Sequence, residues 1–357
     1  MRRTWELVAD LPVEIESHAL EGLELSFSEE FTRMTTLVKL RGGGHEGIGE
    51  DVVYDGLDHV ALQADGGALP LAGSHTLASF AQRLEEIDLW PAPPVREVSE
   101  LYRRWAFESA ALDLALRQAG KSLPKVLGRE ARPLNYVVSM RLGTSFDSTE
   151  PEKADRLLAV LERYPGTRFK LDPTNNWTPE LIDELVATGA VDSLDLKGQY
   201  KDTPVDVTTD PELYAQLIER FPDAWLEDPD VNDETKPLLD PVADRITWDA
   251  PIHSIADIES RPWTPRMVNI KPSRVGPIES LFDLYDYCER EGIDAYGGGQ
   301  TELGEGRGQI QYLAAIFHPD TPNDTAPGGF NQPQLPDGLP TSPLEPRIDA
   351  TGFRWVG

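Results

Sequence analysis

From residue 133 onward, short β-rich runs alternate with amphipathic helical segments, and this alternation constrains the fold more than any other feature of the chain. Strand candidates lie at 135–140, 168–172, 193–197, 224–228, 245–250, 267–272, 294–298 and, more weakly, 314–318. Helical patterns at 152–163, 179–188, 211–220 and 278–291 fall between them. Parallel strands require such crossovers, and eight βα units in about 200 residues predict a closed (β/α)8 barrel.

The residues before this region have a different pattern. Strand candidates at 6–17, 22–27 and 35–41 lead into three consecutive glycines, and an apolar helical pattern follows at 99–119. The N-terminal third is therefore predicted to be an α+β domain within an overall α/β protein. We expect this domain to span residues 1–130 and the barrel to span 131–330. The Pro- and Gly-rich segment 331–357 is expected to return and complete the first domain.

The charge of the chain excludes several classes of partner. There are 62 acidic and 33 basic side chains, which gives a formal net charge of −29. Such a balance argues against binding to nucleic acid or to an anionic membrane. The single cysteine, Cys288, cannot form an internal disulfide, and no apolar run approaches the roughly 18 residues that span a bilayer. We therefore expect a cytoplasmic protein.

Five consecutive strand candidates of the predicted barrel end in charged residues. Reactive groups of such barrels lie at the carboxyl ends of the strands. The residues in this position are Lys170, Asp172, Asp195, Lys197, Glu227, Asp228, Asp249 and Lys271. Mg²⁺ prefers carboxylate oxygens, and Asp195, Glu227 and Asp249 could supply three of them. These three acids are the predicted metal ligands.

Alternation along the strands predicts how the remaining charges pair. Residues i and i+2 share a face, so Lys170 can face Asp195, and Asp172 can face Lys197. Buried charges need such partners. The pairs could be purely structural, or one of the lysines could serve as a base. Lys271 has the same two interpretations, proton transfer or a salt bridge. The glycines after Tyr296 lack dinucleotide-binding spacing and instead favour a sharp turn or a close backbone approach.

Several motifs, taken in order, resemble the enolase superfamily, and most nearly its muconate-lactonizing, cycloisomerase-like branch. Residues 44–50 end in Gly-Ile-Gly-Glu, like the glycine-rich turn of the family's capping domain, and residues 106–116 are similar to its Ala-rich helix. The run Asn-Ile-Lys-Pro-Ser-Arg-Val-Gly contains Lys271, and residues 292–304 resemble the segment of the seventh strand, with Glu302 in place of the family's glutamate.

This resemblance implies a modified (β/α)8 TIM barrel under an N-terminal α+β capping domain. It also implies Mg²⁺ on Asp195, Glu227 and Asp249, with Lys271 as acid or base. The implied activity is that of a lyase or isomerase (cycloisomerase, dehydratase or synthase, or epimerase). Such an enzyme removes the proton α to the carboxylate of a small acid through a metal-stabilised enediolate. Barrels of this size often assemble, so we expect a homo-oligomer.

The second and third strands depart from the pattern of this branch. The second strand usually ends in Lys-x-Lys with the second lysine as base, but here it ends in Lys170-Leu171-Asp172. The third usually offers Asp-x-Asn, but here it ends in Asp195-Leu196-Lys197. Our hypothesis is that Lys197 replaces the missing lysine spatially. Two alternatives remain: Asp172 could be the ligand in place of Asp195, or the chain could be a non-catalytic barrel that acts as a binding or assembly module.

Overall fold

The computed structural model describes residues 3–27, 31–65, 69–143, 148–201, 203, 205–332 and 334–355. Seven parallel barrel strands follow the predicted order in the described residues. They are β6 (Val138–Met140), β7 (Phe169–Leu171), β8 (Val191–Asp195), β9 (Trp225–Glu227), β10 (Ile246–Thr247), β11 (Met267–Ile270) and β12 (Asp294–Gly297). The first seven strand candidates are therefore confirmed, six of them over a shorter range than predicted and the third, β8, shifted by two residues toward the N-terminus.

Single bridges close the barrel where the continuous sheets end. Strands β6 to β10 form one parallel sheet, and β11 pairs with β12. A bridge between Trp248 and Val268 joins the two sheets. Asn323 bridges to Tyr136 beside β6, and Asp324 bridges to Gly298 beside β12, so residues 323–324 occupy the position of the eighth strand. The prediction of a strand at 314–318 was wrong, because most of that apolar run belongs to a buried helix.

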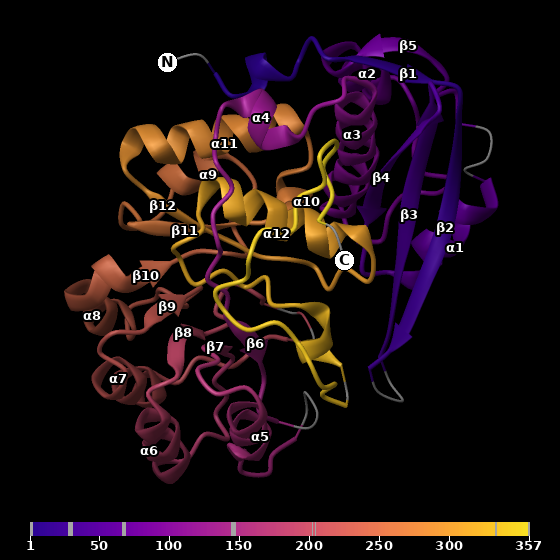
Figure 1. The fold of residues 1–357 in the computed structure, drawn as a ribbon. Helices are drawn as coiled ribbons and strands as arrows, with labels where there is room; N and C mark the ends of the chain where they lie inside the picture. The colour runs from indigo at the N-terminus through magenta and orange to yellow at the C-terminus, as the bar shows by residue number, and fades with distance from the viewer. Residues whose placement is uncertain are drawn as a thin grey trace.

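Amphipathic helices surround the barrel strands (Figure 1). They are α5 (Asp155–Arg163), α6 (Pro179–Thr188), α7 (Pro211–Arg220), α8 (Lys236–Leu239), α9 (Ile255–Glu259), α10 (Pro272–Val275), α11 (Ile278–Glu291) and α12 (Glu305–Phe317), with 3₁₀ turns η3 (Asp240–Arg245) and η4 (Gly328–Asn331). Thr178 and Asp210 cap α6 and α7, each followed by proline at the first helical position. These signals explain why the helical patterns at 179–188 and 211–220 matched so closely.

The N-terminal domain packs a three-stranded antiparallel sheet on a long helix. The sheet has the order β2 (Ser17–Ser26), β3 (Thr32–Gly42), β4 (His45–Asp51), and the helix is α3 (Ser99–Gln118). A Cβ atom at Gly47 would lie 2.2 Å from the Ala110 carbonyl oxygen, and one at Gly49 would lie 2.0 Å from that of Ala106. The glycines of Gly-Ile-Gly-Glu therefore let β4 lie directly on the Ala-rich helix.

Other elements complete this domain. They are η1 (Trp5–Leu7), β1 (Pro12–Ile15), α1 (Gly56–Asp65), β5 (Gly73–Thr76), α2 (Leu77–Glu85) and α4 (Leu123–Leu127). The strand predicted at 6–17 was partly wrong, because its first residues form η1. Strand β4 was not predicted as a strand, since its glycines disrupt the alternation of apolar residues.

The described part of the C-terminal tail returns to the N-terminal domain (Figure 1). Leu344 bridges to Leu134, and Gly352 bridges to Ser122. Phe353 is fully buried against Trp105 of α3. The tail is thus an ordered return segment, although the exact domain limits stay a prediction. No helix among the described residues is long and apolar enough to cross a membrane.

Candidate metal centre and active site

Lys170 lies near the centre of the ring of charges at the carboxyl ends of the strands. Its ammonium group contacts Glu227, lies 3.3 Å from Asp195 Oδ2 and lies 3.5 Å from Asp324 Oδ2. The predicted pairing of Lys170 with Asp195 is therefore present. Burial opposes the charge on Lys170, but the surrounding carboxylates hold its pKa well above the ordinary value. Lys170 is thus a buried ammonium group held by three acids.

Lys197 forms the second predicted pair. Its ammonium nitrogen lies 3.4 Å from Asp172 Oδ2 and also bonds to Asp195. The backbone of Lys197 has a φ of +54°, which a residue with a side chain rarely adopts. Strained backbone of this kind clusters at functional sites. The strain lies where β8 ends and turns the chain so that the side chain of Lys197 folds back over Asp195.

On the other side of the ring, Asp249 is shared by three donors. Lys271 Nζ lies 2.7 Å from one carboxylate oxygen, and the Tyr200 hydroxyl donates to the same oxygen at 3.1 Å. Arg274 donates to the other oxygen at 2.5 Å. Burial disfavours the charge on Asp249, but Arg274 and Lys271 hold its pKa well below the ordinary value. Asp249 is therefore ionised and bound to cations of its own chain.

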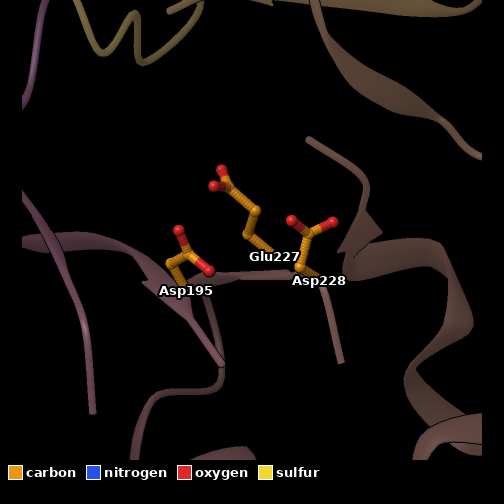
Figure 2. Close-up of side chains that lie close together, drawn as sticks. All are labelled: Asp195, Glu227 and Asp228. Carbon is orange, nitrogen blue, oxygen red and sulfur yellow. The ribbon is translucent and has the colours of Figure 1, made fainter. Parts of the chain in front are cut away.

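Three carboxylates gather between these lysines. Asp195, Glu227 and Asp228 are fully buried, and one oxygen of each lies within 4.8 Å of the others. Figure 2 shows the three side chains close together, with Asp195 at the end of one strand and Glu227 and Asp228 at the end of its neighbour. Asp228 has a φ of +50°, and its oxygens accept the backbone N–H groups of Asp249 and Ala250, both at 2.8 Å. It thus fixes the first residues after β10 and places Asp249 beside the cluster.

The donor set fits a hard divalent cation. The cluster offers only carboxylate oxygens, which are the ligands that Mg²⁺ prefers. Among the described residues at these strand ends, four buried carboxylates face three buried cations. They are Asp195, Glu227, Asp228 and Asp249 against Lys170, Lys271 and Arg274, and the half-buried pair of Asp172 and Lys197 adds one charge of each sign. Burial raises the pKa of Glu227 well above its ordinary value and that of Asp228 to about 7. A bound cation would relieve this concentration of negative charge.

The predicted metal ligands are only partly the residues of this cluster. Asp195 and Glu227 belong to it, whereas Asp249 lies beside it and Asp228 takes the third place. Asp195 ends the third barrel strand, and Asp172 follows the second, as the preferred register required. The assignment of Asp195, Glu227 and Asp249 as ligands stays a prediction.

The predicted residue Glu302 belongs to a different network. It accepts the backbone N–H of Gln300 at 2.7 Å and lies 3.2 Å from Arg307 Nη2. This network lies next to the capping domain, beside Glu50. Its role as a catalytic residue remains a prediction.

Sequence reasoning missed five polar residues of the site, namely Tyr200, Asn269, Arg274, Tyr296 and Asp324. Tyr296 donates from β12 to Glu227 across the barrel. Asn269 is buried two residues before Lys271, and its side-chain amide has no hydrogen-bond partner among the described residues. Asp324 was missed because the eighth strand was placed too early. Proline follows most of the other charged strand ends within three residues, and Pro327 after Asp324 repeats that signal.

The fold and this ring of acids and lysines define the protein class, a capped (β/α)8 barrel with the architecture of the enolase superfamily. The dipeptide epimerase from Methylococcus capsulatus, solved with a Mg ion, has a TM-score of 0.66 at 18% identity and covers 87% of this chain and 89% of its own. The muconate lactonizing enzyme from Pseudomonas putida has a TM-score of 0.61 at 19% identity over 91% and 90% of the two chains. The predicted resemblance is thus confirmed for the fold.

The chain belongs to the DUF8230 family. The family's N-terminal domain of unknown function matches residues 6–126, and its C-terminal domain of unknown function matches residues 130–332. In sequence, the chain is 26% identical to the N-succinylamino acid racemase of Thermus thermophilus over 335 residues, which cover 85% of this chain and 80% of the racemase. These named relatives are enzymes, in agreement with the expected enzyme.

Proposed function

We propose that this protein is a Mg²⁺-dependent lyase or isomerase that removes the proton α to the carboxylate of a small acid. The observation that carries the proposal is the buried cluster of Asp195, Glu227 and Asp228, flanked by lysine ammonium groups on two sides. Asp195 and Glu227 of this cluster would hold the ion together with Asp249, which lies beside the cluster. When bound, the ion would stabilise the negative charge that develops on the substrate carboxylate.

The lysines supply the means to move a proton. Lys271 is nearly buried beside Asp249 at the end of β11, and it is our candidate for the acid or base on that side. Lys197 reaches the opposite side, in front of Asp172 and Asp195. It is the most exposed of the three lysines, with 13% of its side chain accessible against 8% for Lys271 and 3% for Lys170. Lys170 lies deeper and keeps Glu227 and Asp195 in place.

Substrates of the structural and sequence relatives suggest the probes. An N-succinylamino acid and a dipeptide both carry a C–H group next to a carbonyl carbon. The test is therefore to incubate the protein with Mg²⁺ and a panel of N-succinylamino acids and dipeptides in deuterated water. Proton NMR then follows loss of the α-hydrogen signal. Exchange that requires both the protein and Mg²⁺ is the expected result.

Matched variants separate a catalytic site from a passive one. Asp195→Asn should abolish Mg²⁺ binding by calorimetry together with exchange. Asp192→Asn changes an acid near the other end of the same strand, which pairs with Arg168 and not with the cluster, and should leave both intact. A wild-type protein that neither binds Mg²⁺ nor exchanges any probe would refute the proposal and would favour a binding or assembly module.

A further inference from the structure

The segment between β12 and α12, residues 298–304, is held by the capping domain and touches the catalytic lysine candidate. We call it the β12–α12 loop. Thr301 in this loop has a φ of +56°, the third described non-glycine residue with a positive φ, after Lys197 and Asp228. A residue with a side chain keeps such a conformation only where its surroundings impose it. The surroundings here are two charged side chains from the cap.

Arg33 of β3 binds the first half of the loop through hydrogen bonds. Only 1% of the residue is exposed, and its guanidinium group donates to the Gln300 carbonyl at 2.8 Å and to the Thr301 carbonyl at 3.2 Å. It also donates to the carbonyls of Val52 and Val53 within the cap. The planar guanidinium offers five N–H donors in a fixed geometry, so one side chain joins the two domains rigidly.

Glu50 of β4 binds the second half of the loop through hydrogen bonds. Its carboxylate is fully buried and accepts the backbone N–H groups of Leu303 at 2.7 Å, Gly304 at 3.0 Å and Gly306 at 2.8 Å. These amides form the N-terminus of α12, which has no capping side chain of its own. An anion at a helix N-terminus satisfies unpaired amides and interacts favourably with the helix dipole. The cap thus supplies this helix cap from another domain.

The β12–α12 loop lies directly against Lys271 and near its partners. A Cβ atom at Gly298 would lie 2.6 Å from Lys271 Cε, so the backbone of the loop forms one wall around the lysine side chain. Gln300 donates to the Tyr102 hydroxyl at 2.9 Å, and Tyr102 lies against Arg274, which holds Asp249. The loop therefore contacts the lysine directly and is connected to Asp249 through Tyr102 and Arg274.

We propose that Arg33 and Glu50 are positioning residues, which hold the β12–α12 loop so that Gly298 and Gln300 fix Lys271 for proton transfer. This inference rests on the proposed function in taking Lys271 as the acid or base. It assigns the capping domain a part in the geometry of catalysis, because a small displacement of the loop shifts the lysine relative to the substrate. Misplacement by about 1 Å can cost about 100-fold in rate.

Two matched pairs of variants test this proposal. Arg33→Met and Glu50→Gln remove the hydrogen bonds of these two residues to the β12–α12 loop. Arg41→Met and Glu46→Gln instead alter an exposed ion pair on the same two strands. Protein labelled with ¹³C at lysine Cε gives an NMR signal for Lys271, assigned by its absence in Lys271→Met. We expect Arg33→Met and Glu50→Gln to shift that signal and to lower kcat for α-hydrogen exchange at least about tenfold, with KM within about twofold. The controls should change neither, and Arg33→Lys should restore part of kcat.

The outcomes separate this inference from the proposed function. If the wild-type protein exchanges no probe, the proposed function fails, and the NMR signal alone decides whether the cap positions Lys271. An unchanged Lys271 signal in both Arg33→Met and Glu50→Gln overturns the inference. A raised KM with unchanged kcat overturns it too, because the cap would then only bind substrate. If Arg33→Met does not fold, Arg33→Lys and Glu50→Gln decide by the same measurements.

Discussion

Lys197 Nζ lies 3.4 Å from Asp172 Oδ2, so the ammonium group that follows β8 faces the carboxylate that follows β7. In the branch that the sequence resembles, a lysine usually stands at the position of Asp172 and an asparagine at the position of Lys197. That Lys197 takes the place of the branch's second lysine stays our hypothesis, and this contact supports it.

This relationship predicts that the lysine can be moved from position 197 to position 172 with most of the activity retained. Lys197→Asn alone should lower α-hydrogen exchange at least about 100-fold, because a proton-transfer group is lost and Asp172 is left without its partner. The double variant Asp172→Lys with Lys197→Asn restores an ammonium group and should recover most of the rate. Measurement of kcat in the three proteins checks this. A double variant no better than the single one would show that Lys197 does not occupy the lysine's role.

Gly298 should tolerate no side chain. Its replacement by alanine places a Cβ atom 2.6 Å from Lys271 Cε and 2.8 Å from Asn269 Oδ1, so the lysine must move. We expect Gly298→Ala to fold but to lose at least about tenfold in kcat. Gly328→Ala is the control, because a Cβ atom there meets nothing within 4 Å. Equal activity in the two variants would contradict the close packing of the loop on Lys271.

Two buried asparagines should respond in opposite ways to leucine. The side chain of Asn269 makes no hydrogen bond with the described part of the chain, whereas the side-chain amide of Asn323 bonds to Gly297, His318 and Asn135. Asn269→Leu should raise the free energy of unfolding by about 1 kcal/mol and should lower exchange activity if the amide contacts a ligand. Asn323→Leu should lower the free energy of unfolding by about 3 kcal/mol. Urea unfolding of both variants checks the signs.

His318 should make the fold sensitive to acid. Burial lowers the pKa of this imidazole to about 4 from an ordinary value of 6.5, and its ring nitrogens bond to Asn323 and Tyr285. The unfolded chain therefore binds the extra proton first as the pH falls, and stability decreases between about pH 6.5 and 4. The loss from this group is about 3 kcal/mol.

A His318→Gln variant isolates that contribution. Its free energy of unfolding, measured in urea from pH 7 to 4, should fall less steeply than that of the wild-type protein, since the titrating ring is gone. Parallel curves for the two proteins would mean that His318 is not held in its neutral form.

Periodicity predicted the barrel well because the strands are short and regularly spaced, and helices such as α6 and α7 begin at a clear cap. It failed at 323–324, where two residues take the place of a strand and leave no periodic signal. The end-of-strand rule brought together Lys170, Asp195, Glu227 and Asp249, and the alternation of faces predicted both lysine–acid pairs. No local pattern could predict that Glu302 and Glu50 share a network, because their proximity depends on how the cap lies on the barrel.

Residues 323–324, at the position of the eighth strand, determine two properties at once. These are the closure of the barrel and the charge at its centre. Asn323 and Asp324 close the circle of backbone bridges, and the same dipeptide places a carboxylate beside Lys170 and an amide under His318. A change in the length of the preceding turn would open the circle and unbalance the charge at its centre together. Descendants of this chain should therefore vary in the connection at residues 334–341 before they insert or delete a residue between His318 and Asp324.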